Sequence, residues 1–124
     1  MPSERRKYPR IAESVLCRVS AEGQTWSAHT RNISCGGALC SLPKPIPLMT
    51  KLDIHFELPP FSEGSPGETI HCVGVVVRQS LKPESGGAAS YATAIYFSEL
   101  KPEDRRRIAE FVLHAMLSRN HRGP

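Results

Sequence analysis

The sequence predicts an all-β fold with one C-terminal helix, and three observations carry that prediction. Apolar and polar residues alternate in short segments between residues 13 and 99, the pattern of half-buried strands. Residues that favour turns separate these segments, so that six strands follow one another at short spacing. The apolar period then changes to that of a helix over residues 100–120. Six closely spaced strands are typical of a barrel or a sandwich.

The first three strands are expected at residues 13–20, 24–33 and 38–42. Glu22-Gly23 has the composition of the turn between the first two. Alternation in the second strand predicts one face made of Trp26, Ala28 and Thr30. Three prolines after residue 42 end the third strand and hold the following connection extended.

The other three strands are expected from Lys51 to Leu58, at 69–79 and at 90–98. The Lys51–Leu58 segment has the clearest two-residue period in the chain. The 69–79 segment is nearly all apolar in its middle, which predicts cover on both faces. Gly74 within it indicates a bend or bulge of the kind that barrel closure requires.

The helix is indicated by Pro102 in a first turn and by two acidic residues that suit a helix N-terminus. Its apolar stripe consists of Ile108, Phe111, Val112, Ala115 and Met116. Arginines occupy positions 105–107, and a solvated face is favoured over a binding role for them.

Size and composition indicate one ordinary globular domain. The chain has 124 residues, of which 40% are hydrophobic and 23% charged. No segment approaches the roughly 20 apolar residues of a membrane span, and the polar start does not resemble a signal peptide. Four cysteines without metal or disulfide spacing predict reduced thiols and a cytoplasmic location. The net charge of +4 is concentrated in the first ten residues and the last helix, which favours an anionic partner.

No pattern of catalytic or metal-binding residues stands out. The five histidines form no metal-spaced cluster, and neither a G-x-S-x-G elbow nor a phosphate-binding G-x-x-x-x-G-K-[ST] loop occurs. The sequence therefore predicts a protein that is not an enzyme and uses no metal or cofactor.

Two features remain as candidates for binding. Residues 1–12 form a basic arm that is expected to be flexible, and Arg5, Arg6 and Arg10 lie in it. A guanidinium group can bind a phosphate or a guanine edge with two hydrogen bonds. A solvated basic tail is the alternative reading of this arm.

The second feature is a corner from Asn32 to Gly37. If the backbone is extended there, Asn32 and Ser34 project from one face beside a turn. Gly36 and Gly37 lack a Cβ, so either can adopt a positive φ and let another group approach the backbone. Taken alone, the corner favours an ordinary hairpin.

Taken together, the two features resemble the PilZ domain family, whose motifs are R-x-x-x-R and [D/N]-x-S-x-x-G. Here these motifs read Arg6-Lys7-Tyr8-Pro9-Arg10 and Asn32-Ile33-Ser34-Cys35-Gly36-Gly37, and the resemblance covers essentially the whole chain. The resemblance implies a six-stranded antiparallel β-barrel at 13–99 that binds cyclic di-GMP. It implies that the ligand-binding residues are Arg6, Arg10, Asn32, Ser34 and Gly37, and that Arg5 and Gly36 could add contacts. One departure lies at Ala94-Ile95-Tyr96-Phe97, where the family often has Gly-x-x-Phe.

The resemblance further implies a non-enzymatic receptor that passes its signal to an effector protein through rearrangement of the arm. Two alternatives remain open, a basic nucleic-acid-binding barrel and an adaptor that docks a protein without ligand. DNA or RNA is not the expected partner, because the few aromatic residues are not arranged as a stacking platform.

Overall fold

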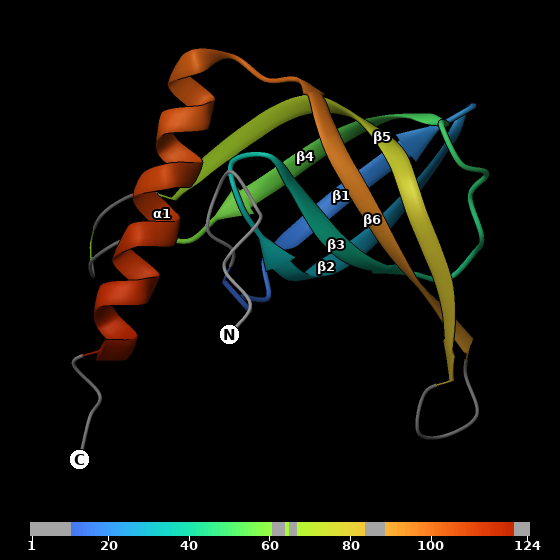
Figure 1. The fold of residues 1–124 in the computed structure, drawn as a ribbon. Helices are drawn as coiled ribbons and strands as arrows, with labels where there is room; N and C mark the ends of the chain where they lie inside the picture. The colour runs from blue at the N-terminus through green and yellow to red at the C-terminus, as the bar shows by residue number, and fades with distance from the viewer. Residues whose placement is uncertain (1–10, 61–63, 65–66, 84–88, 121–124) are drawn as a thin grey trace, which may run out of the picture.

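Six antiparallel strands close into a barrel that is followed by one helix in the computed structural model of the chain (Figure 1). The structure describes residues 11–60, 64, 67–83 and 89–120. The strands are β1 (Leu16–Ala21), β2 (Gln24–Ile33), β3 (Gly37–Leu42), β4 (Lys51–Leu58), β5 (Glu68–Pro83) and β6 (Ala89–Glu99), and the helix is α1 (Pro102–Asn120). Their order around the barrel is β1-β2-β3-β6-β5-β4, and pairing of β4 with β1 closes it. The predicted fold class is confirmed, and the barrel is the correct choice over the sandwich.

The barrel interior is filled by the inward-facing residues of every strand. Along β4, the apolar residues of the two-residue period are all buried, as expected. Phe56 packs edge-on against Phe97 of β6, with ring centroids 5.5 Å apart. All four cysteines are free and buried, and burial is the main cause that raises the pKa of Cys72 to about 12.

The residues before β1 leave the sheet ladder, although the first strand was expected to begin at residue 13. The Thr30 hydroxyl accepts a hydrogen bond from the Val15 N–H at 2.9 Å and donates one to the Glu13 carbonyl. The Thr30 N–H still donates to the Val15 carbonyl at 3.0 Å, but the Val15 N–H bonds the hydroxyl instead of a backbone carbonyl, so β1 begins only at Leu16. Strands β5 and β6 also run further than predicted and form one long hairpin.

Replacing Thr30 with Val is expected to lower the free energy of unfolding by about 1–3 kcal/mol, because it leaves the buried Val15 N–H without its acceptor. Urea denaturation of the two proteins measures this difference. Thr25→Val is the matched control, since the Thr25 hydroxyl bonds Ser20 at the surface and its loss should stay within about 0.5 kcal/mol. Equal stability of the Thr30 variant and the native chain would contradict the role of this hydroxyl.

The long strand β5 is bent at two places, which confirms the expectation from Gly74. The pairing register with β6 shifts between Val73 and Gly74 and again between Val76 and Arg78. A Cβ on Gly74 would lie 2.5 Å from the side chain of Ile95, so only glycine fits this contact. The expectation that β5 is covered on both faces is wrong at Val77. This residue lies between the two registers at the second bulge, and its side chain is 49% exposed.

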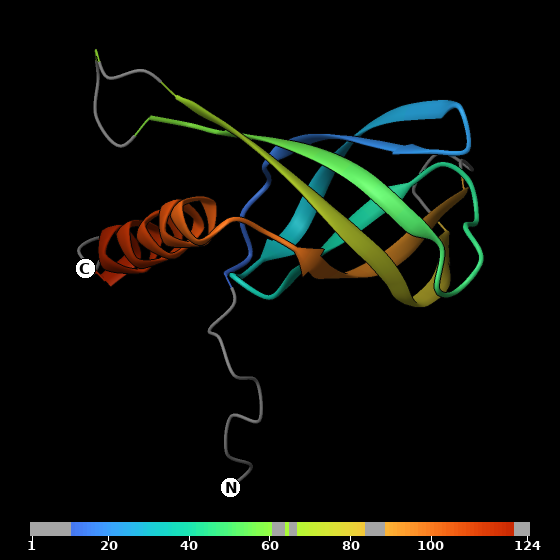
Figure 2. The same ribbon diagram turned by 90° about the horizontal axis from the view of Figure 1, so that it is seen from above.

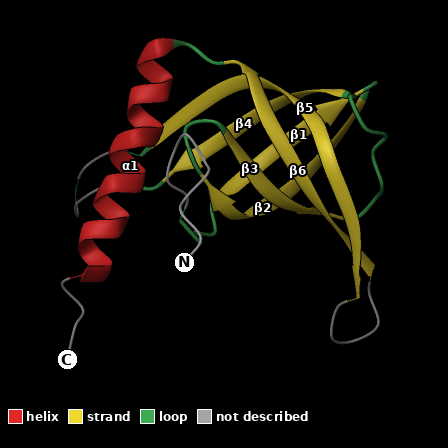
Figure 3. Cartoon of the chain, viewed as in Figure 1, coloured by secondary structure: helices red, strands yellow, loops and turns green. Residues whose placement is uncertain are grey.

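Helix α1 packs at one end of the barrel through Ile108, Phe111 and Val112, while the loop between β3 and β4 lies at the opposite end (Figures 2 and 3). Met116 was expected in the same buried stripe but is exposed. The arginines of the first turns are not simply solvated. Arg107 forms ion pairs with Glu68 at 2.6 Å and with Asp104 at 2.9 Å, and both contacts raise its pKa. Among the described residues, no helix combines the length and apolar character needed to cross a membrane.

Candidate functional site

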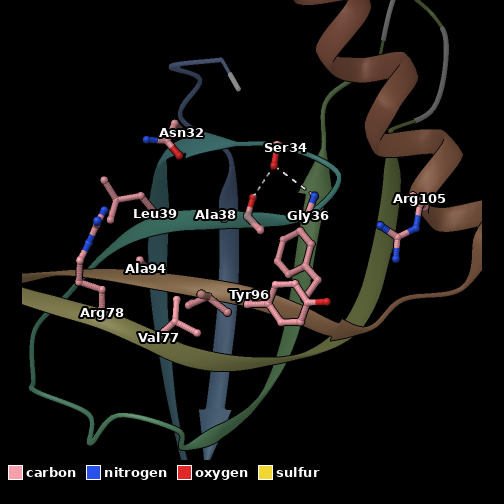
Figure 4. A pocket seen from close by; sticks show the side chains of 13 residues that line it. Asn32, Ser34, Gly36, Ala38, Leu39, Val77, Arg78, Ala94, Tyr96 and Arg105 are labelled. Carbon is pink, nitrogen blue, oxygen red and sulfur yellow. Dashed lines mark hydrogen bonds between the residues drawn. The ribbon is translucent and has the colours of Figure 1, made fainter. Parts of the chain in front are cut away.

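A pocket of about 520 Å³ opens beside the turn between β2 and β3 (Figure 4). Its walls come from the end of β2, the start of β3, the middle of β5 and β6, and the first turn of α1. The lining residues are Asn32, Ser34, Gly36, Gly37, Ala38, Leu39, Val77, Arg78, Ala94, Ile95, Tyr96, Phe97 and Arg105. All four described residues of the predicted site therefore line one cavity.

Gly37 stands where the backbone of β3 meets the backbone of β6. A Cβ at this position would lie 2.2 Å from the carbonyl oxygen of Ile95, closer than any real contact. Among the described glycines, positive φ angles occur at Gly23 and Gly64, and not at Gly36 or Gly37. Gly37 is thus needed for close approach, as predicted, whereas the positive φ considered for this corner is not used.

Ser34 shapes the turn with its own hydroxyl. The Gly36 N–H donates to Ser34 Oγ at 3.1 Å, and the Ser34 N–H donates to the Gly37 carbonyl at 2.9 Å. The side chain is only 4% exposed, so its hydroxyl is largely committed to the protein. Asn32 differs, since no described residue hydrogen-bonds its half-buried amide. In Figure 4 both residues lie on the β2 side of the pocket, with the Ser34 bonds drawn as dashed lines.

Arg105 joins the helix to this turn. Its Nη1 atom donates a hydrogen bond to the Cys35 carbonyl at 3.0 Å, and the Cys35 thiol lies 3.7 Å from the Arg105 carbonyl. Burial raises the pKa of Cys35, which keeps that thiol neutral. The turn that carries the motif is therefore held from outside by the first turn of α1.

The pocket is suited to an anion with flat, partly apolar groups. Arg78 and Arg105 enter it from opposite sides, as Figure 4 shows, and none of the described residues that line it carries a carboxylate. Tyr96 is 56% exposed and presents an aromatic surface in the same space. Among the described residues, no group of three or more His, Cys, Asp or Glu residues could hold a metal ion.

Sequence reasoning did not identify Arg78, Tyr96 or Arg105 as site residues. Arg105 was noted within the arginine cluster, but nothing local distinguishes it from its neighbours. Arg78 and Tyr96 reach the pocket only because of the register between β5, β6 and β3, and no short motif encodes that register.

The basic arm joins the barrel at the motif itself. Ile11 is buried and pairs with Ile33, with N–H to carbonyl distances of 3.2 Å and 3.0 Å in the two directions. Ile33 stands between Asn32 and Ser34 in the chain. The predicted ligand-binding residues Arg5, Arg6 and Arg10 lie outside the described residues. Ile11 directly follows Arg10 in the chain, and its partner Ile33 stands between two residues that line the pocket.

Comparison with protein families finds that the sequence model of the PilZ domain matches residues 4–114. The chain belongs to the PilZ domain family. Among curated protein sequences, none matches this chain.

Several solved structures are similar to this chain. The PilZ domain of YcgR from Escherichia coli, solved with c-di-GMP, has a TM-score of 0.70 at 16% identity, with 96% of this chain and 95% of that chain covered. MotI/DgrA, the Bacillus subtilis inhibitor of motility, has a TM-score of 0.78 at 19% identity, with coverage of 94% and 53%. The MrkH–c-di-GMP complex from K. pneumonia has a TM-score of 0.76 at 20% identity, with coverage of 98% and 57%. The chain thus spans just over half the length of MotI and MrkH. At these identities the similarity is one of fold.

The departure from the Gly-x-x-Phe pattern of the family does not disturb the barrel. Phe97 is buried against Phe56, and Ala94 lines the pocket with its methyl group. The local packing at this departure is therefore intact.

Proposed function

We propose that this PilZ domain is a non-enzymatic cytoplasmic receptor for cyclic di-GMP. The observation that carries the proposal is the pairing of Ile11 with Ile33, which attaches the R-x-x-x-R arm to the motif that lines the pocket. This pairing supports a site to which both halves of the family's ligand-binding motif contribute. The PilZ domains of YcgR and MrkH, solved with c-di-GMP, support the choice of ligand.

Each residue has a role that its chemistry suits. The ligand carries two phosphates and two guanines, and the guanidinium groups of Arg6 and Arg10 can bind either one with two hydrogen bonds. Arg5 could add a contact. The Asn32 amide can both donate to and accept from a guanine edge.

The pocket residues also contribute shape and positive charge to the site. Ser34 and Gly37 hold the turn in its present form, and the Gly36 N–H is bonded to Ser34 Oγ within that turn. Arg78 and Arg105 add positive charge at opposite sides, which lowers the cost of enclosing a dianion.

We further propose that ordering of the arm passes the signal to an effector protein. Fixing a flexible segment costs about 1–2 kcal/mol per residue in backbone entropy, so contacts with the ligand must exceed that cost. Binding would then change the position of the N-terminal residues relative to the barrel and alter the surface that a partner meets.

Calorimetric titration tests the proposed ligand directly. Cyclic di-GMP is expected to bind with a saturable heat, and cyclic di-AMP and GTP to bind at least about tenfold more weakly, a difference of about 1.4 kcal/mol. Adenine presents an amino group where guanine presents O6, so the arginine contacts to the base are lost with cyclic di-AMP. Equal affinity for all three nucleotides, or no heat with cyclic di-GMP, would refute the proposal.

A salt titration separates this function from nucleic-acid binding. A barrel that neutralises 6–10 phosphates of DNA loses about 10³–10⁵ in affinity between 50 mM and 200 mM salt. A ligand with two phosphates should show a far shallower dependence. Filter binding of a double-stranded oligonucleotide and calorimetry of cyclic di-GMP over the same salt range give the comparison. A steep slope for the oligonucleotide together with tight binding at low salt would instead favour the nucleic-acid alternative.

A further inference from the structure

An apolar groove lies next to the ligand pocket, at the end of the barrel opposite α1. It has a volume of about 490 Å³ and lies between the loop after β3 and the middle of β5. Figures 1 and 2 show this loop passing beside β5 at that end of the barrel. The lining residues are Pro45, Ile46, Pro47, Leu48, Val77, Arg78 and Gln79.

The loop presents two apolar side chains, Leu48 and Met49, to solvent at an energetic cost. Leu48 is 62% exposed and Met49 is 72% exposed. Met49 has a φ of 71°, a left-handed conformation that is unfavourable for a non-glycine residue. Strain of this kind persists only where surrounding contacts impose it, and it is concentrated at functional sites.

Hydrogen bonds between the loop and β5 impose this conformation. The Met49 N–H donates to the Val76 carbonyl at 2.7 Å, and the Val76 N–H donates to the Thr50 carbonyl at 3.1 Å. The Ile46 N–H donates to the side chain of Gln79 at 3.2 Å. The loop is therefore a fixed wall of the groove, with Leu48 and Met49 held outward.

The other wall offers an open strand edge. Pairing of β5 with β4 ends at Val75, and within the described residues the loop makes no backbone hydrogen bond to β5 beyond Val76. The backbone groups on this edge of β5 from Val77 onward are thus available to an added strand. An extended peptide can dock on such an edge through main-chain hydrogen bonds and place alternate side chains in adjacent apolar space.

The positive charge around the groove indicates which kind of partner it can bind. Arg78 lines the groove, Lys44 is exposed on the adjoining loop, and no carboxylate lines the groove among the described residues. A second copy of the chain would bring the same positive charges together, which is unfavourable. Acidic side chains on a partner would complement them.

We propose that this groove docks an extended segment of an effector protein, with apolar side chains on one face and acidic side chains beside them. The apolar side chains pack against Leu48 and Val77, and the backbone adds to the edge of β5. The effector that the proposed function left unspecified would thus bind at this groove through a segment with acidic and apolar side chains.

The groove and the ligand pocket share two residues, Val77 and Arg78. A dianion in the pocket would therefore contact the same side chains that line the groove, so that ligand and partner influence each other's binding. This coupling rests on the proposed function, whereas the docking groove itself does not.

The test uses a random peptide library displayed on phage and selected on the full chain. The selected peptides are expected to be acidic and partly apolar, and to bind the variant Leu48→Ser/Met49→Asn at least about tenfold more weakly than the native chain. Asparagine at position 49 tolerates the positive φ, so the loop conformation is retained. The control Leu113→Ser/Leu117→Ser removes exposed apolar side chains from α1 and should bind the same peptides normally.

A second measurement does not depend on the variants. Amide chemical shifts of the native chain should change at residues 46–50 and 77–81 on addition of the selected peptide. Shift changes confined to α1, selection of basic peptides, or equal binding to both double variants would overturn the proposal. Concentration-dependent dimerisation in sedimentation experiments that the loop variant abolishes would assign the groove to a second copy, and would also overturn it.

Calorimetry with cyclic di-GMP separates the two proposals. The loop variant should bind the nucleotide as the native chain does, because neither substituted residue lines the pocket. Peptide docking without any nucleotide binding would refute the proposed ligand, while the proposal that the groove docks a partner would stand. Nucleotide binding without peptide docking would refute the docking groove, while the proposed ligand would stand.

Discussion

Replacing Gly37 with Ala is expected to lower the free energy of unfolding by roughly 3 kcal/mol, the scale of a severe overpacking defect. The added methyl group would lie 2.2 Å from the Ile95 carbonyl oxygen, an atom of the β6 backbone that has no rotamer to move away. Strands β3 and β6 would have to separate where Gly37 pairs with Tyr96. Urea denaturation measures the loss of stability, and calorimetry should show weakened cyclic di-GMP binding, because the same backbone lines the pocket.

Gly23→Ala is the matched control for this experiment. Gly23 has a φ of 81° with nothing within 4 Å of an added Cβ, so its substitution carries only the conformational cost of about 1–2 kcal/mol. Gly23 lies in the turn between β1 and β2 and does not line the pocket, so Gly23→Ala should leave ligand binding unchanged. A Gly37→Ala variant as stable as the native chain would contradict the claim that β3 and β6 lie too close at this point to admit a Cβ.

Arg10→Ala is expected to weaken cyclic di-GMP binding by at least about 2 kcal/mol, or about thirtyfold. The reason is the position of Ile11, which follows Arg10 directly and is hydrogen-bonded to Ile33 in the motif. A guanidinium group can bind a phosphate or a guanine edge with two hydrogen bonds, and its removal would leave those ligand groups unpaired. Isothermal titration calorimetry of the variant provides the affinity.

Arg18→Ala removes the same charge from a different surface and serves as the control. Arg18 is exposed on β1 and does not line the pocket. Its substitution should leave the affinity for cyclic di-GMP almost unchanged, since a distant surface charge is screened by salt. If the Arg10 variant bound cyclic di-GMP as tightly as the Arg18 variant, Arg10 would not be a ligand-binding residue.

Local pattern was sufficient to predict most of the fold. The period of two along β4 predicted which side chains are buried, and the period of a helix predicted the contact of Ile108, Phe111 and Val112 with the barrel. These predictions held because burial of a strand or helix face depends on side-chain spacing that can be read from a few adjacent residues. Residues 32–37 were found in a different way, through the resemblance of their motif to a family.

Contacts between distant segments decided the rest. The bulge that exposes Val77, the entry of Arg78 and Tyr96 into the pocket, and the bond from Arg105 to the Cys35 carbonyl all depend on strand register and helix packing. The same is true of the pairing that attaches residue 11 to residue 33. Composition and periodicity identified the segments of this protein, but only the closed barrel determined which of them share a cavity, because that choice depends on contacts between residues up to 70 positions apart in the chain.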